Sequence, residues 1–118
     1  MKTSHQNQTW ISSDDVQGTD VFDIKGSHIG EIDHLIIEKM SGRVIYGVLS
    51  FGGFIGLGKS HYPIPWKKLT YDKSKGGFCT DISEEQLRDA PEFREDSWSD
   101  REWESSIHSY YDVPPYWL

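Results

Sequence analysis

The sequence has little of what secreted proteins and membrane proteins depend on. Its 118 residues contain one cysteine, Cys79, so no intramolecular disulfide can form and a reducing, cytoplasmic compartment is expected. No apolar run approaches the roughly 20 residues needed to cross a bilayer, and the first ten residues lack the apolar core of a signal peptide. The sequence therefore predicts one domain with no direct membrane insertion.

Residue patterns that carry chemistry are also missing. There is no Gly-x-Ser-x-Gly nucleophile elbow and no Cys–His pair, because Cys79 lies in a predicted strand with no histidine nearby in sequence. The five histidines are scattered, and His28 and His34 lie too far apart along one strand to share a metal ion directly. A metal would need Asp33, Glu31 or a second chain. We expect no enzymatic activity, no metal site and no cofactor.

Basic residues are few, and the acidic excess is local. The net charge is −7, from 12 Lys and Arg against 19 Asp and Glu. From Asp81 onward there are eleven acidic and three basic residues, whereas residues 1–80 are nearly balanced. The chain lacks the basic face of a nucleic-acid binder, and Trp66-Lys67-Lys68 is too small a patch to supply one. The acidic part is typical of a solvated surface or, alternatively, of a docking surface for a basic partner.

The segment from Arg43 to Trp66 is the most apolar and most glycine-rich of the chain. Between Val44 and Phe51 both alternating sets of side chains are apolar or small, which predicts a central strand covered on both faces. The glycines that follow, at positions 52, 53, 56 and 58, allow backbone conformations that other residues avoid. The segment therefore predicts a strand, a glycine-rich connection and a second extended run.

Within this segment, Gly53–Ser60 matches the phosphate-binding loop pattern G-x-x-x-x-G-K-[ST]. Such a loop binds phosphate at the start of a helix, which would have to begin at Lys59. Pro63 and Pro65 follow too closely for a helix and favour an extended chain. Nucleotide binding is therefore the less favoured alternative to a connection that turns a barrel corner.

Turn signals divide the body of the chain into short strands. Glycine-containing turns are expected at residues 24–26, 39–42 and 73–76. Short strands at this spacing predict a small antiparallel β-barrel. The predicted strands are Asp20–Asp23, His28–Glu38, Val44–Phe51, Tyr62–Trp66, Leu69–Asp72 and Gly77–Thr80.

Beyond the strands the pattern becomes helical. Ser83–Gln86 has the sequence of a capping box, and Pro91 ends the short helix that follows. Ser99–Glu102 repeats the capping box and begins a C-terminal amphipathic helix. This helix carries one aromatic stripe, which is expected to pack on the barrel or, alternatively, against a second subunit or another protein. The stripe consists of Trp103, Ile107, Tyr110 and Tyr111.

Spaced motifs run across the body of the chain. They are Gly18-Thr19-Asp20-Val21, Lys25-Gly26, Ile29-Gly30-Glu31-Ile32, Leu35-Ile36-Ile37, Ser41-Gly42-Arg43-Val44, Tyr46, Val48-Leu49-Ser50-Phe51-Gly52-Gly53, Gly56, Gly58, Ile64-Pro65-Trp66 and Leu69. Together these motifs resemble those of the PRC-barrel family, and His34 stands where members commonly carry an acidic residue.

The resemblance implies a small β-barrel at residues 12–93. It also implies a protein that docks onto macromolecular partners, as in the photosynthetic reaction centre H subunit and a ribosome maturation factor, with no enzymatic activity assigned. The residue pattern adds a disordered segment at 1–11 before this domain and a helical, acidic and aromatic tail at 94–118 after it.

These observations favour a non-enzymatic protein–protein interaction module that associates with itself as a homodimer. Two alternatives remain: an accessory to a photosynthetic reaction centre or electron-transfer complex, and a nucleotide-binding protein that uses Gly53–Ser60. The residues expected to contact a partner are apolar side chains of the glycine-rich loop and aromatic side chains near the C-terminus. They are Phe54, Ile55, Leu57, Tyr110, Tyr116 and Trp117.

Overall fold

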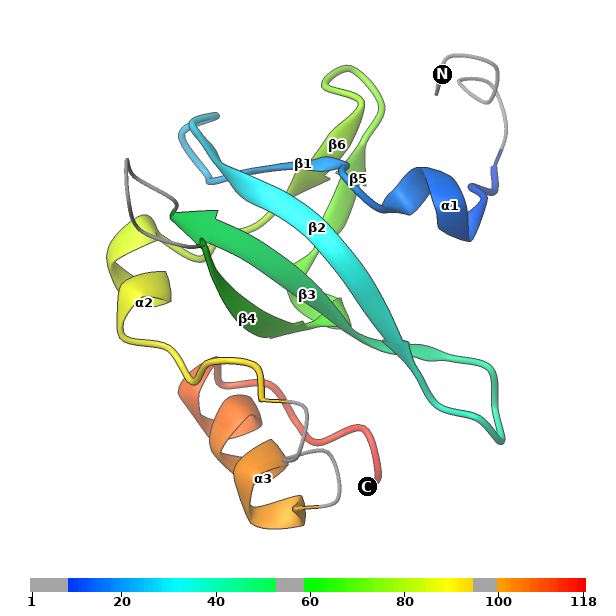
Figure 1. The fold of residues 1–118 in the computed structure, drawn as a ribbon, viewed down its shortest axis with the longest axis vertical. Helices are drawn as coiled ribbons and strands as arrows, with labels where there is room; N and C mark the ends of the chain where they lie inside the picture. Colours follow the sequence, from blue (N-terminus) through cyan, green and yellow to red (C-terminus); the bar gives the residue numbers. More distant parts are fainter. Residues whose placement is uncertain (1–8, 53–58, 95–99) are drawn as a thin grey trace.

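The structure, a computed structural model, describes residues 9–52, 59–94 and 100–118 as a twisted β-sheet with short helices around it (Figure 1). All the predicted strands are present. The one-turn helix α1 and the 3₁₀ turn η1 were not predicted. The elements in chain order are α1 (Ser13–Val16), β1 (Asp20–Phe22), β2 (His28–Ile37), β3 (Val44–Gly52), β4 (Lys59–Pro65), η1 (Trp66–Lys68), β5 (Thr70–Asp72), β6 (Gly77–Cys79), α2 (Glu84–Arg88) and α3 (Arg101–Tyr110).

The sheet is mixed and open, which corrects the prediction of a closed antiparallel barrel. Its strand order is β4-β3-β2-β1-β6-β5, and β1 and β6 run parallel, with Val21 opposite Phe78. Within the described chain, the end strands β4 and β5 each pair with one neighbour only. The prediction failed because it assumed that strands pair with their sequence neighbours, whereas β6 returns past four intervening strands to lie beside β1.

Strand β3 is covered on both faces, as predicted. Four consecutive residues from Tyr46 to Leu49 are buried, so side chains of both alternating sets are removed from water. Gly47 allows this packing, because a Cβ atom at this position would lie 2.9 Å from the side chain of Leu69. The strand is second in the sheet order, an interior strand rather than the middle one.

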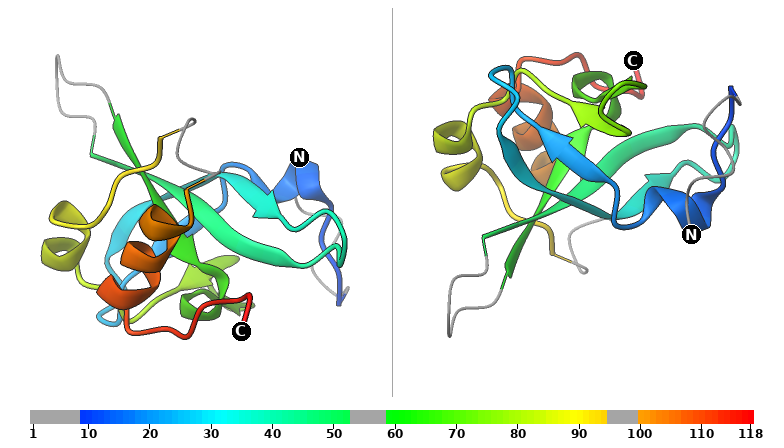
Figure 2. Two further views of the ribbon diagram at one scale, coloured as in Figure 1. Left: turned by 90° about the horizontal axis from the view of Figure 1, so that it is seen from below. Right: turned by 90° about the horizontal axis from the view of Figure 1, so that it is seen from above.

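The tight turns also follow the sequence. Gly26, Gly42 and Gly76 have φ angles of 86°, 76° and 63°, which only glycine adopts without strain. The second of these turns closes the long β2–β3 hairpin, which projects from the sheet (Figures 1 and 2). Bulges between the strands increase the local twist.

Both C-terminal helices pack on the sheet through their apolar faces. The capping box at Ser83 is confirmed by reciprocal hydrogen bonds with Gln86. Helix α3 begins one residue later than predicted, because its N-cap is Asp100, whose carboxylate accepts from the backbone N–H groups of Glu102 and Trp103; the predicted cap, Ser99, lies outside the described residues. Ile107 of the aromatic stripe is fully buried and Tyr111 is 3% exposed, so the stripe packs on the chain's own core.

Candidate functional site

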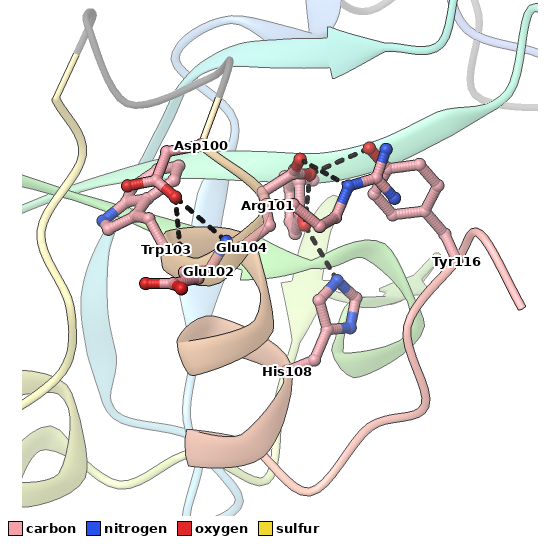
Figure 3. A network of polar contacts seen from close by, with 8 residues as sticks. Asp100, Arg101, Glu102, Trp103, Glu104, His108 and Tyr116 are labelled. Atoms are coloured by element: carbon pink, nitrogen blue, oxygen red, sulfur yellow. Dashed lines mark hydrogen bonds and ion pairs between the residues drawn. The ribbon is translucent and has the colours of Figure 1, made fainter.

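A buried polar network joins helix α3 to the sheet (Figure 3). The Tyr46 hydroxyl of β3 donates to a carboxylate oxygen of Glu104 at 3.0 Å and lies 2.8 Å from Nε2 of His108. Tyr116 donates to the same Glu104 oxygen at 2.8 Å. Because the only hydroxyl proton of Tyr46 goes to Glu104, the imidazole of His108 must donate from Nε2.

Arg101 supplies the positive charge nearest to this network. Its Nε lies 3.8 Å from the second carboxylate oxygen of Glu104, which is itself only 4% exposed. The guanidinium also stacks 4.0 Å from the centre of the Trp117 ring, a cation–π contact. His108 meets the same ring edge-on. The network therefore holds residues 116–117 of the tail against α3.

Burial sets the protonation of these groups. It raises the pKa of Tyr46, with the Glu104 charge adding to the effect, and it raises the pKa of Tyr116 to about 12. Burial also lowers the pKa of His108. At neutral pH the two phenols are hydrogen-bond donors and the imidazole is uncharged. Tyr46, Glu104 and His108 do not line either of the two open cavities described for this part of the chain, at the β1–β2 turn and at residues 17–18.

Sequence reasoning missed Glu104 and His108 because it assigned charged residues to the solvated face. The signal was their spacing of four residues, which places both on one helix face, each directly after a stripe residue. Both are buried in the structure, and Glu104 accepts from a tyrosine 58 positions away in the sequence. That partner could not be identified without the fold.

The C-terminal tail meets the β2–β3 hairpin through Arg43, and both segments carry exposed apolar side chains. Arg43, which follows the hairpin turn, donates to the Tyr116 carbonyl at 3.2 Å. In Figure 1 the chain end lies on the same lower side of the sheet as the hairpin, apart from its tip. Three apolar side chains stand out in water here: Ile37 is 50% exposed, Met40 96% and Leu118 91%. We call this the hairpin–tail surface; its residues are Ile37, Met40, Arg43, Trp117 and Leu118.

The structure separates the predicted contact residues into three groups. Tyr116 and Trp117 are half-buried; Trp117 belongs to the hairpin–tail surface, and Tyr116 contacts it through Arg43. Tyr110 lies elsewhere, beside helix α2, since its hydroxyl donates to the backbone carbonyl of Gln86 in that helix. The apolar residues of the glycine-rich loop, Phe54, Ile55 and Leu57, lie outside the described residues. Whether any of the six contacts a partner stays a prediction.

The phosphate-loop pattern lacks its helix. Lys59 and Ser60 begin strand β4, where they pair with Gly52 and Phe51 of β3. Their backbone N–H groups are therefore part of an extended strand and do not form a helix N-terminus facing an anion. This confirms the extended conformation that Pro63 and Pro65 predicted.

An open cavity with a volume of about 790 Å³ lies among the β1–β2 turn, η1, β6 and residues 112–114. Four lysines and four aspartates line it, so it has no net charge to attract an anion. Lys68, which belongs to the Trp66-Lys67-Lys68 patch, forms an ion pair with Asp81 at 3.3 Å. Cys79, which also lines this cavity, is half-buried, and its Sγ lies 3.8 Å from the Asp72 carboxylate.

Exposed histidines and carboxylates gather on the outer side of β1, β2 and β4. His28 lies 2.9 Å from Asp20, while Asp33 lies between His34 at 2.7 Å and His61 at 3.6 Å. As predicted, His28 and His34 do not come together. The fold instead brings Glu31 within 4.8 Å of both Asp20 and His28, a grouping that sequence spacing did not show.

Comparison with known proteins identifies the fold family. No curated protein matches the chain significantly. None of the helices in the described part of the chain has the length and apolar character needed to span a bilayer. A family model, the PRC-barrel domain, matches residues 10–87, about two thirds of the sequence and every strand of the sheet. The chain therefore belongs to the PRC-barrel domain family.

Proposed function

We propose that the chain is a non-enzymatic interaction module that forms a homodimer through the hairpin–tail surface. The observation that carries the proposal is Met40, which is 96% exposed at the tip of the hairpin, with Ile37 half-exposed on the same hairpin and Leu118 exposed at the chain end. Apolar side chains that project together into water mark interaction sites more often than single exposed ones do. The absence of a recognisable catalytic pattern in the sequence and the docking role implied by the family support this function.

The surface is held in place before any partner arrives. The Tyr116 carbonyl accepts from Arg43, and the ring of Trp117 is stacked on Arg101. A tail that is already ordered loses little conformational entropy on binding, so more of its contact energy remains as affinity. This arrangement favours the tail as part of an interface.

Charge favours a second copy of the chain as the partner. The whole protein carries a net charge of −7, so two copies repel one another over most of their surface. Around the hairpin, Lys39 and Arg43 offset Glu38, and this area is not acidic. Arg43 and Glu38 form an ion pair at 3.9 Å within one copy. In a two-fold arrangement the two pairs can approach one another, so that Arg43 of one copy also faces Glu38 of the other.

Sedimentation velocity over a range of protein concentrations tests the proposal. The unmodified chain is expected to form dimers, and Met40→Asp is expected to raise the dissociation constant at least about tenfold by placing a charge in the apolar contact. Ile24→Asp is the matched control, because Ile24 is 81% exposed in the β1–β2 turn at a distance from the hairpin. A strictly monomeric chain, or equal weakening by both variants, would overturn the proposal.

A further inference from the structure

Asp20, His28 and Glu31 form a compact group of metal-ligating side chains on the outer side of β1 and β2. Each offers one donor atom, and the three atoms lie within 4.8 Å of one another. His28 Nε2 and Asp20 Oδ1 are only 2.9 Å apart. We propose that these three residues bind a divalent transition-metal ion of the zinc type.

A bulge in the sheet creates this group. Asp20 faces Glu31 directly across the β1–β2 pair, whereas beyond Val21 the register shifts so that Phe22 faces His28. In a regular strand, residues 28 and 31 would point to opposite faces, because their separation is odd. The register shift turns the His28 side chain to the face that carries Glu31. Bulges commonly re-aim side chains near functional sites in this way.

The group lacks a cation of its own. Two carboxylates lie close together, and among the described residues neither Asp20 nor Glu31 forms an ion pair with a lysine or arginine. The only ion-pair partner of Asp20 in that part of the chain is His28. A divalent ion would neutralise both carboxylates and accept the imidazole lone pair at the same time.

The donor set indicates the class of metal. One imidazole nitrogen with two carboxylate oxygens suits Zn²⁺ and similar ions better than Mg²⁺ or Ca²⁺, which prefer oxygen ligands alone. Tetrahedral ligands with bonds of about 2.0–2.2 Å lie about 3.4 Å from one another. Binding therefore requires His28 Nε2 and Asp20 Oδ1 to separate slightly from their 2.9 Å contact and the Glu31 oxygen to move inward. The side chains of His28 and Asp20 are 51% and 48% exposed, so they have room for this adjustment and for water as a fourth ligand.

A second histidine cluster on the same face supplies the matched control. Asp33 contacts His34 through one carboxylate oxygen and His61 through the other. Because the two histidines approach different oxygens, this cluster does not bring three donor atoms within the same short distance in the described chain. His34 therefore has an acidic neighbour, as His28 does, but lacks a third ligand close by.

Isothermal titration of the full chain with ZnCl₂, MgCl₂ and CaCl₂ tests the assignment. We expect saturable Zn²⁺ binding at one site and a loss of affinity of at least about tenfold in both His28→Ala and Glu31→Gln, since even indirect supports of a metal site commonly contribute that much. His34→Ala should bind Zn²⁺ as the unmodified chain does. In NMR spectra, the ring signals of His28 should shift on Zn²⁺ addition.

Several results would overturn the proposal. They are an absence of saturable Zn²⁺ binding, unchanged binding in His28→Ala, or a loss that appears in His34→Ala instead. Tighter binding of Mg²⁺ or Ca²⁺ than of Zn²⁺ would also refute it, because the imidazole would then not be a ligand. His28 and Glu31 lie on the sheet surface, and a circular dichroism spectrum confirms that each variant is folded before titration.

Discussion

Two buried tyrosines should respond in opposite ways to loss of their hydroxyl groups. Tyr46 is fully buried, and its hydroxyl contacts Glu104 at 3.0 Å and His108 at 2.8 Å. Tyr111 is 3% exposed, and its hydroxyl has no hydrogen-bond partner within the described chain. Tyrosine to phenylalanine changes both side chains by the same single oxygen atom, so the pair isolates the value of the polar network.

The expected magnitudes follow from what each hydroxyl leaves behind. Tyr46→Phe removes one hydrogen-bond donor from the buried Glu104 carboxylate and the acceptor of the buried His108 imidazole. The free energy of unfolding should fall by about 1–3 kcal/mol as a result. Tyr111→Phe removes a polar atom that was buried without a partner, so it should be neutral or stabilising by up to about 1 kcal/mol. For a chain of this length, 1 kcal/mol corresponds to roughly 3–6 °C in Tm.

Urea unfolding followed by tryptophan fluorescence measures both effects. All variants are compared at one protein concentration, because self-association would stabilise the folded state by mass action. The exposed Tyr71→Phe serves as a control and should change stability by less than about 0.5 kcal/mol. If Tyr46→Phe unfolds at the same urea concentration as Tyr111→Phe, the network does not stabilise the fold and the reasoning is wrong.

Three further predictions concern pH, a helix cap and a glycine. Burial depresses the pKa of His108 in the folded chain. As pH falls, the imidazole is therefore protonated in the unfolded chain before it is protonated in the folded one. The folded state keeps its full stability above about pH 6.5 and loses stability as pH falls below that value. Urea midpoints at pH 7.5 and 5.5 measure this loss, which His108→Gln should reduce. Ser83→Ala removes the α2 cap and should lower the free energy of unfolding by about 1 kcal/mol, measured in the same assay. Gly30→Ala would place a Cβ atom 2.3 Å from the Ser50 carbonyl, and its Tm should fall by several degrees, corresponding to about 1–3 kcal/mol. Unchanged Tm values for the last two variants would contradict the local geometry.

Local features of the fold could be predicted from the sequence because they depend on a few adjacent residues. The left-handed turns at Gly26 and Gly42 and the capping box at Ser83 are of this kind. The α3 cap was misplaced by one residue because Ser99 and Asp100 are both good capping residues, and local rules do not choose between them.

Features that join distant segments could not be predicted in this way. The parallel pairing of β1 with β6 depends on how the whole sheet twists. The contact of Tyr46 with Glu104 depends on where α3 docks, and no periodicity links two residues so far apart in sequence. The approach of His28 to Asp20 depends on a bulge, which shifts the side-chain alternation on which strand predictions are based.

Hydrogen exchange at low and high protein concentration tests the central claim that two copies meet through the hairpin–tail surface. The account predicts slower exchange at high concentration in residues 37–43 and 116–118, and unchanged exchange around the β1–β2 turn at residues 23–27. Exchange that is independent of concentration throughout the chain, or slowed only away from the hairpin and tail, would contradict it.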